Sequence, residues 1–342
     1  MYVTVQYMRA AAALSVLLFH ILGYYWPWPG YFPYVLASGV DLFFIISGFI
    51  MVATTRSHFD LGRFAWSRFC RVVPYWWIAL LAYIVVRYLL TDYWPQVESI
   101  AQSALLIPHF NELSNDPVPI LGPGWSLTNE LVFYFIFGVT LSFSTGRPLL
   151  HLGSLFIVFT ALAALRLLAA PDSAIGIRLT TPTFFEFLLG CAVAYYFDPI
   201  TRYLKRIRLA LLVCGLTVLG FINFLYFRDH LPRVLIFGLP FFLVFTGALL
   251  YEPEARRFEL AFLKKLGDAS YSLYLTHMLV LIVLERCGLF ASLSALPGII
   301  VATGISVAFA LLAYAYVEKP LLTANRRLAF IRRPRGSPQP AA

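Results

Sequence analysis

Long apolar runs separated by short polar loops extend along almost the whole chain. Each of these runs approaches the roughly 20 residues that a helix needs to cross a bilayer. We predict spans at about 5–25, 34–54, 74–91, 125–143, 149–170, 181–197, 208–227, 232–250, 268–286 and 297–317. The pattern therefore predicts an all-α polytopic membrane protein with about ten transmembrane helices.

The composition agrees with this class of protein. The chain has 342 residues, of which 60% are hydrophobic and only 13% charged, unlike a soluble domain. The first run is longer than a signal-peptide core, and Trp26-Pro27-Trp28-Pro29 follows it instead of a cleavage site, so we expect it to remain as an anchor. We expect one transmembrane domain over 1–325 and a basic, disordered cytoplasmic tail over 326–342.

The placement of Lys and Arg predicts the orientation. With a cytoplasmic N-terminus, most of the 26 Lys and Arg residues lie in inner segments, as the positive-inside rule requires. Those left for the outer side are Arg87, Arg166, Arg178, Arg228, Arg233 and Arg286. This predicts an N-in/C-in topology and explains the net charge of +9 by topology and lipid contact. Nucleic-acid binding is not expected, because the basic residues are scattered over separate loops.

The first predicted span contains two ionisable residues, Arg9 and His20, in the spacing R-x10-H. Eleven residues at about 100° each come within about 20° of three full turns, so both side chains project from one face, roughly 16 Å apart along the axis. Ionisable groups inside a span are costly and indicate function. The alternative is an arginine that snorkels to the interface and one hydrogen-bonded core histidine.

Four ionisable side chains share one depth in the predicted membrane. We place His20, Asp41, Glu130 and Glu186 within roughly 6–10 Å of the outer boundary, each on a different helix. Because carboxylates are expensive in lipid unless paired or wet, we favour one shared polar chamber. The alternative is a set of separate interhelical hydrogen bonds, each worth about 1 kcal/mol.

The predicted inner face carries a second polar cluster. Arg68 and Arg71 form an R-x-x-R pair just before Pro74, which we expect to open the third span. Together with Arg9, such a fork suits an anion such as a phosphate. Ordinary positive-inside anchoring is the alternative for each single arginine. Glu318 is the nearest candidate counter-charge. The four cysteines include no C-x-x-C motif, so neither a disulfide framework nor a metal site is expected.

Two further stretches place polar residues on one helix face. In GPGWSLTNELVFY, residues 122–134, the shared face carries Ser126, Glu130 and Phe133. In LGDASYSLYLTH, residues 266–277, Ser270, Tyr274 and His277 fall within about 60° of one another. A histidine such as His277, taken alone, is more often a core residue than a catalyst.

These blocks, in this order, resemble the membrane-bound acyltransferase family 3 over nearly the whole chain, and most of all its exopolysaccharide O-acetyltransferases. The resemblance rests on R-x10-H at Arg9 and His20, GVDLFFIISGF at 39–49, Arg68-x-x-Arg71 before Val73-Pro74, WSLTNELVFY at 125–134, FEFLLG at 185–190, LGDASYSLYLTH at 266–277 and VEKP at 317–320. It implies transfer of an acetyl group from cytoplasmic acetyl-CoA to a carbohydrate, in the inner membrane of a bacterium.

The resemblance also suggests roles for the buried polar residues. A histidine with a pKa of about 6.5 can deprotonate a sugar hydroxyl, and we assign that role to His20, oriented by Asp41 or Glu130. The remaining assignments are Arg9, Arg68 and Arg71 for coenzyme A, Tyr271, Ser272 and Tyr274 for the thioester tunnel, and Trp125, Ser126, Asn129, Glu186 and His277 for the acceptor side. Asn129 or Ser126 would stabilise the developing oxyanion. No metal is expected, and direct transfer and an acyl-histidine or acyl-serine intermediate both stay open.

Other functions remain compatible with the sequence. The acceptor could be O-antigen, peptidoglycan, a lipid-linked sugar, a Nod factor or a macrolide instead of an exopolysaccharide. A proton- or solute-coupled transporter also uses intramembrane histidines and carboxylates, although we find no internal repeat or paired interrupted helices. A structural subunit of a polysaccharide export complex is a third reading. Membrane lipid is an expected partner, and a homodimer is compatible with the chain.

Overall fold

Helices form all of the regular secondary structure in the computed structural model, which describes residues 2–26, 34–55, 59–169, 172–222 and 231–331. They are α1 (Val3–Tyr25), α2 (Tyr34–Ala37), α3 (Gly39–Thr55), α4 (Leu61–Thr91), α5 (Val97–Ala104), α6 (Gly124–Ser144), α7 (Pro148–Ala169), α8 (Ala174–Leu179), α9 (Phe184–Tyr195), α10 (Phe197–Leu204), η1 (Lys205–Ile207), α11 (Arg208–Ile222), η3 (Val234–Gly238), α12 (Leu239–Leu249), α13 (Glu252–Arg257), α14 (Ala261–Asp268), α15 (Ser270–Arg286), α16 (Leu289–Ser292), α17 (Ala295–Ala313), η4 (Tyr314–Glu318) and α18 (Lys319–Ile331). Among them, η3 and η4 are single π-helical turns.

The all-α polytopic architecture predicted from the sequence is confirmed. Among the described residues, seven helices are long and apolar enough to cross a membrane, and the pair α14–α15, bent by 72°, would make an eighth. The expectation of about ten spans is therefore too high for the described residues. The run 208–227 falls short because α11 ends at Ile222 and 223–230 lie outside the description, and in the run 232–250 the apolar helix Val234–Leu249 is too short.

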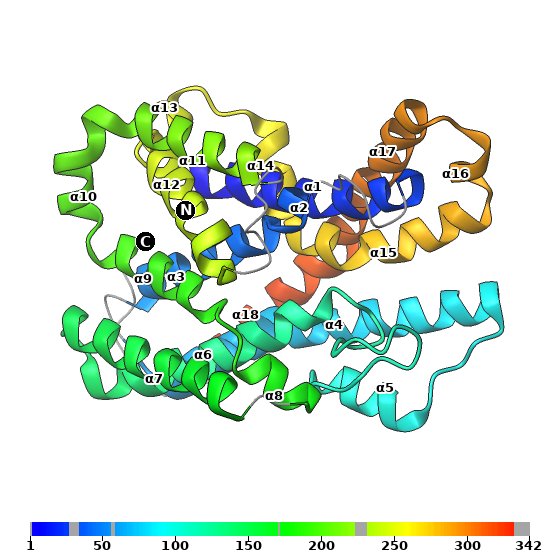
Figure 1. Ribbon diagram of the computed structural model, residues 1–342, viewed down its shortest axis with the longest axis horizontal. Coiled ribbons are helices and arrows are strands. Elements are labelled where there is room, and N and C mark those ends of the chain that lie inside the picture. The colour runs from blue at the N-terminus through cyan, green and yellow to red at the C-terminus, as the bar shows by residue number, and fades with distance from the viewer. Residues whose placement is uncertain (1, 27–33, 56–58, 170–171, 223–230, 332–342) are drawn as a thin grey trace.

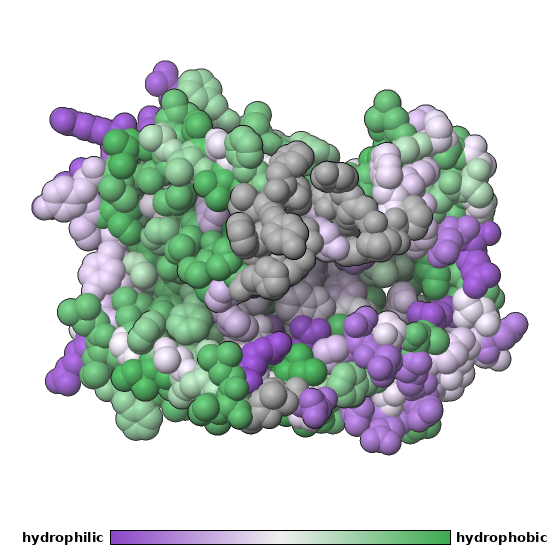
Figure 2. Space-filling model, viewed as in Figure 1, coloured by the Kyte–Doolittle hydropathy of each residue, from purple (hydrophilic) through white to green (hydrophobic). Residues whose placement is uncertain are grey.

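The surface separates apolar from polar side chains. In Figure 2, hydrophobic residues cover much of the left half of the visible face, while hydrophilic residues stand at its left edge and gather at the lower right, around the end of α4 and α5. Such a distribution fits a protein whose middle is covered by lipid and whose ends reach water. The N-in/C-in orientation remains a prediction. Helix α18 continues to Ile331, into the segment predicted to be a disordered tail, and 332–342 lie outside the described residues.

Helices α1, α3, α4, α6 and α15 surround the centre of the molecule. In Figure 1, α1 and α4 both run along the long axis of the view, one in the upper part and one in the lower. Helix α1 packs against α3, α14 and α15, while α15 also packs against α4 and α17. The inner walls of this group carry half of the site residues that the sequence singled out, namely Arg9, Arg68, Arg71, Ser126, Glu130, Tyr271 and Tyr274.

Helices α3 and α9 meet backbone to backbone. A Cβ atom on Gly48 would overlap the carbonyl oxygen of Phe187, and a Cβ on Gly190 would overlap that of Ile45. Small residues allow such close approach between helices in a membrane, where packing replaces the hydrophobic effect as the driving force. The contact holds the N-terminal turns of α3 and α9 next to each other.

A carboxylate from a distant helix caps the start of α1. Glu252 on α13 accepts hydrogen bonds from the backbone amides of Val3 and Thr4, both at 2.9 Å, and from the Thr4 hydroxyl at 2.7 Å. Arg256, one turn along α13, donates to the same carboxylate at 2.6 Å. The first amides of a helix have no partner within the helix, so this contact replaces a local cap. Partial burial acts to raise the pKa of Glu252, but these donors outweigh it, and the pKa lies below its ordinary value.

The sequence suggested that Pro74 opens a helix. In the structure Pro74 instead lies inside α4, which begins at Leu61. The helix starts there because the side chain of Asp60 accepts from the amide of Arg63 at 2.7 Å, a regular N-cap. A proline inside a helix deprives the carbonyl four residues earlier of its donor. Here that carbonyl belongs to Cys70, and the side chain of Asn325 donates to it at 3.3 Å. Arg68 and Arg71 are consequently held on a continuous helix.

The contact between α3 and α9 predicts a large effect of a single methyl group. Gly190→Ala should lower the thermal midpoint of unfolding in detergent, because overpacking costs about 1–3 kcal/mol. Gly153→Ala on α7 is the matched control: a Cβ there meets no atom within 4 Å. Its midpoint should stay level or rise, because alanine favours a helix over glycine by about 1 kcal/mol. A Gly190→Ala protein as stable as the wild type would contradict this contact.

The cap of α1 predicts a pH-dependent contribution to stability. Because the pKa of Glu252 is depressed in the folded protein, its contribution is complete above its unfolded pKa of about 4.3 and is lost as the pH falls through the folded value. Glu252→Gln should therefore lower the thermal midpoint by a few degrees at pH 7, and the difference from the wild type should shrink below about pH 4.3. The exposed Glu98→Gln on α5 is the control. A difference that is independent of pH would refute the role of the carboxylate charge.

Candidate functional site

A large cavity lies between α1, α3, α4, α6 and α15. Its volume is about 1200 Å³, above the roughly 300–1,000 Å³ typical of pockets for drug-sized ligands. The lining begins with residues near the starts of α1 and α4, such as Gln6 and Arg63, and reaches Ser126 and Tyr274. The cavity is thus an elongated space that runs from the predicted cytoplasmic ends of the helices towards their middle.

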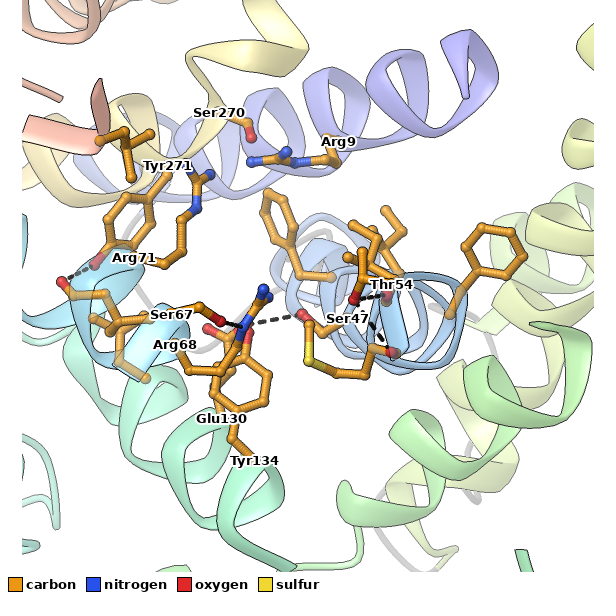
Figure 3. A pocket seen from close by; sticks show the side chains of 18 of the residues that line it. Arg9, Ser47, Thr54, Ser67, Arg68, Arg71, Glu130, Tyr134, Ser270 and Tyr271 are labelled. Carbon is orange, nitrogen blue, oxygen red and sulfur yellow. Dashed lines mark hydrogen bonds between the residues drawn. The ribbon is translucent and has the colours of Figure 1, made fainter. Parts of the chain in front are cut away.

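Three arginines predicted to bind an anion line this cavity together. Figure 3 shows Arg9 from α1 and Arg68 and Arg71 from α4 with their guanidinium groups around the same space. Arg71 forms an ion pair with the buried Glu318 at 3.1 Å, whereas Arg9 and Arg68 form no ion pair with any described residue. The wall therefore keeps a positive charge that an anionic ligand could neutralise.

Aromatic rings hold two of these arginines in place, and a hydroxyl group supports the partner of one of them. The guanidinium of Arg71 lies 5.6 Å from the ring centroid of Tyr271, and that of Arg68 lies 5.8 Å from the ring of Tyr134. Such cation–π contacts stabilise a cation by about 0.5–2 kcal/mol. Ser272 does not line the cavity; it donates to Glu318 at 2.6 Å and so supports the partner of Arg71.

Glu130 belongs to the arginine cavity and not to His20. Its carboxylate accepts from Ser47 on α3 at 2.9 Å and from Tyr134 one turn along α6, and Figure 3 shows all three beside Arg68. Ser126, one turn before Glu130, lines the same cavity. Ser126 and Glu130, on the predicted face of α6, therefore line the cavity. Phe133, predicted on the same face, stacks on Phe187 in the core.

His20 lies outside the large cavity. It lines a smaller pocket of about 220 Å³ with Gly23, Tyr24, Met278 and Leu281. Its Nδ1 is 2.9 Å from the carbonyl oxygen of Val16, and its ring centroid is 4.8 Å from that of His277 on α15. The sequence suggested that Asp41 or Glu130 orients the ring of His20. In the described part of the chain, no hydrogen bond joins His20 to either carboxylate.

Tyr274 stands between the cavity and the histidine pair. Its hydroxyl lies 2.8 Å from that of Ser126 and donates to the carbonyl of Pro123 at 3.1 Å, while its ring centroid is 6.1 Å from that of His277. The order of side chains is therefore Ser126, Tyr274, His277 and His20. These four residues connect the large cavity to the small pocket.

Asp41 and Glu186 form a third group, with an arginine that the sequence did not single out. Arg233, just before η3, holds the fully buried Asp41 through two hydrogen bonds of 2.7 and 2.6 Å. Glu186, also fully buried, lies near enough to interact electrostatically with Asp41. The predicted common chamber is therefore resolved into separate groups, because depth along a helix does not specify the direction of a side chain around it.

Two other residues predicted on the acceptor side lie outside the cavity. The fully buried Asn129 donates to Thr183 at 3.3 Å, and Arg178 lies 4.8 Å over the ring of Trp125. Arg63 and Trp66, which the sequence did not single out as site residues, extend the lining of the cavity along α4. Both precede Arg68 by less than two helical turns, which could have indicated a shared helix. A helix that began only at Pro74 would have excluded these residues and Arg71. No group of three His, Cys, Asp or Glu residues that could hold a metal ion occurs within the described ranges.

Comparison with known proteins gives independent information. A family model described as an acyltransferase domain matches residues 2–315. The exopolysaccharide production protein ExoZ of Rhizobium meliloti (strain 1021) is 29% identical over 304 residues, which cover 85% of this chain and 90% of ExoZ. The O-acetyltransferase OatA of Staphylococcus aureus (strain NCTC 8325 / PS 47) is 25% identical over 313 residues, which cover 80% of this chain and half of OatA. No solved structure matches the chain.

Proposed function

This chain belongs to the acyltransferase 3 family, as a multi-pass membrane O-acyltransferase, and on this premise we propose that it transfers an acetyl group from cytoplasmic acetyl-CoA to a hydroxyl of an exported or cell-surface polysaccharide. The observation that carries the proposal is the cavity with Arg9, Arg68 and Arg71 on its walls, next to a histidine pair. The family match favours this reading over a transporter or a structural subunit.

The cavity is suited to the donor by its charge and size. Coenzyme A carries several phosphate charges, and planar guanidinium groups bind phosphate oxygens in pairs. Arg9 and Arg68 would bind these phosphates, since neither forms an ion pair with a described carboxylate, and Arg71 would act while held by Glu318. Trp66, on the wall near Arg63, offers an apolar face to the rest of the nucleotide.

His20 would act as the general base through its Nε2 atom. A carbonyl oxygen can only accept a hydrogen bond, so the Nδ1 that contacts Val16 carries the proton. The lone pair of the neutral ring is then on Nε2, which can take the proton of a sugar hydroxyl as that oxygen attacks the thioester carbonyl. Ser126, at the end of the cavity, is the candidate donor to the oxyanion.

The contact between Tyr274 and Ser126 must open for this reaction. Both residues line the large cavity and neither lines the pocket of His20, while the ring centroid of Tyr274 lies 6.1 Å from that of His277. We infer that the side chain of Tyr274 turns away when the pantetheine arm enters, so that the thioester reaches His20. The Asp41–Arg233–Glu186 group, at the predicted outer side, would then lie on the acceptor side of the reaction.

The polysaccharide acceptor is suggested by the name of ExoZ and the membrane site by the helices. We place the protein in the bacterial inner membrane, where cytoplasmic acetyl-CoA and an exported glycan can both be reached. A different hydroxyl acceptor, such as O-antigen or a lipid-linked sugar, would leave the donor site unchanged. Mass spectrometry of the cell-surface glycans from a deletion strain would identify which glycan loses acetyl groups.

The role of His20 predicts a separation of binding from transfer. His20→Ala should lower acetyl transfer by about 10²–10⁴-fold, because the general base is lost, while acetyl-CoA binding and the thermal midpoint stay near wild type. The measurement is the O-acetyl content of the polysaccharide in a deletion strain complemented with either gene. Transfer at the wild-type rate in His20→Ala would exclude His20 as the base.

Radiolabelled acetyl-CoA without acceptor tests the covalent route: label bound to the wild type but not to His20→Ala would indicate an acyl-enzyme.

The arginine wall predicts a loss of donor affinity. Arg68→Ala should weaken binding of acetyl-CoA by about tenfold or more, because a charge-assisted hydrogen bond contributes about 1.5–3 kcal/mol. The effect should decrease with added salt, which screens the charges. Arg87→Ala is the matched control: it lies on the same helix, α4, but does not line the cavity. Isothermal calorimetry on the purified protein measures both variants, and equal affinities would refute the assignment of Arg68.

A further inference from the structure

The large cavity has an open end and a buried end. At the open end, which we call the mouth, the exposed residues Thr54, Arg63 and Trp66 belong to its lining. At the other end, Ser126 and Tyr274 each have only 6% of their surface exposed. A ligand that fills the cavity therefore has one part near water and another part inside the protein.

The arginines that α4 contributes to this cavity lie at different depths. Arg63 is the third residue of the helix, and at about 1.5 Å per residue Arg68 lies roughly 7.5 Å and Arg71 roughly 12 Å further along the axis. Arg63 is exposed, whereas Arg68 and Arg71 are half-buried. Figure 3 shows these two deeper arginines around one space with Arg9 of α1. The cavity thus holds three cations in its middle and one at its mouth.

The charge of Arg63 is available to a ligand. Arg63 forms no ion pair with any described residue. Asp60, the acidic residue nearest to it in the sequence, accepts from the backbone amide of Arg63 at 2.7 Å as the N-cap of α4. Positive-inside anchoring accounts for an exposed arginine near the inner face, but it does not require that the residue line a cavity.

The phosphates of coenzyme A are divided in the same way as these cations. A diphosphate lies between the pantetheine arm and the adenosine, and a separate phosphate monoester is attached to the 3′-oxygen of the ribose. If the thioester occupies the buried end near Ser126, the pantetheine arm fills the inner part of the cavity. The diphosphate then comes to the three arginines in the middle, and the adenosine with its 3′-phosphate comes to the mouth.

An aromatic ring accompanies the arginine at the mouth. Trp66, three residues after Arg63 on α4, lines the cavity and stacks on Phe69, with ring centroids 5.6 Å apart and planes inclined by 18°. This stacking holds the indole close to Arg63. Nucleotide bases stack on aromatic side chains, so the mouth combines a partner for a base with a partner for a phosphate.

We propose that Arg63 forms a subsite for the 3′-phosphate of coenzyme A, separate from the diphosphate subsite of Arg9, Arg68 and Arg71. This inference rests on the proposed function. A phosphate monoester carries about −1.5 to −2 charges at neutral pH, and a guanidinium group can bind two of its oxygens at once. The subsite selects coenzyme A over acyl carriers that present phosphopantetheine without a 3′-phosphate on adenosine.

The test compares coenzyme A with 3′-dephospho-coenzyme A, which lacks only the proposed ligand of Arg63. In calorimetry on the purified protein, the wild type should bind coenzyme A about tenfold more tightly, because a charge-assisted hydrogen bond is added. Arg63→Ala should weaken the binding of coenzyme A by the same factor and leave that of the dephospho compound unchanged. Arg68→Ala should weaken both compounds equally and so preserve the preference.

Two further measurements serve as controls. Arg147→Ala removes an exposed arginine that does not line the cavity, and it should bind both compounds as the wild type does. With acetyl-CoA as donor, Arg63→Ala should raise KM and leave kcat near the wild-type value, because the 3′-phosphate is bound equally in the ground state and the transition state. A lipid headgroup phosphate could use the same guanidinium, but it would produce no difference between the two compounds.

The outcomes separate this subsite from the proposed function. Equal affinities of the wild type for the two compounds, or a preference that persists in Arg63→Ala, would overturn the subsite while acetyl transfer by the wild type still stands. If the wild type binds neither compound and transfers no acetyl group, the proposed function fails. If Arg63→Ala does not fold, Arg63→Lys decides: it keeps the charge but loses the fork, so the preference should decrease, and an unchanged preference overturns the subsite.

Discussion

A charge that leaves water loses several kcal/mol of hydration energy, and in the interior of a membrane protein only other protein groups can replace that energy. This cost decides how the ionisable side chains of this chain are arranged. Asp41 is matched by two hydrogen bonds from Arg233, and Arg71 by Glu318. Each of these pairs joins segments that are far apart in the sequence, so the same contacts that neutralise charge also determine which helices are neighbours.

What remains unpaired defines the places where a ligand can act. Arg9 and Arg68 have no ion-pair partner among the described residues and face a cavity of about 1200 Å³. The Nε2 of His277 has no donor either and lies next to His20. An unbalanced positive wall suits an anionic donor, and the neutral ring of His20 suits the movement of a single proton. These two properties, in neighbouring spaces, are what acyl transfer from a charged carrier requires.

The scaffold keeps these groups in register through close backbone contacts. Gly48 and Gly190 let α3 and α9 approach each other, and Gly267 lets α14 lie directly on the backbone of Gln6 in α1. Glu252 fixes the first turn of α1. Helix α1 carries both Arg9 and His20, so a rigid α1 maintains the separation of about 16 Å between the arginine wall and the histidine pair.

The sequence by itself determined the membrane class, the positions of most helices, the shared face of Arg9 and His20 and the motifs of the family, because apolar run length and helical periodicity are local properties. It also indicated that Arg68 and Arg71 act together. Only the tertiary structure decided which partner each buried group meets. Depth along an axis does not specify rotation about it, and so Asp41 faces Arg233, 192 residues away, instead of His20. The passage of α4 through Pro74 was likewise decided by a contact from elsewhere, because the carbonyl of Cys70 that Pro74 leaves without a donor is satisfied by Asn325 on another helix.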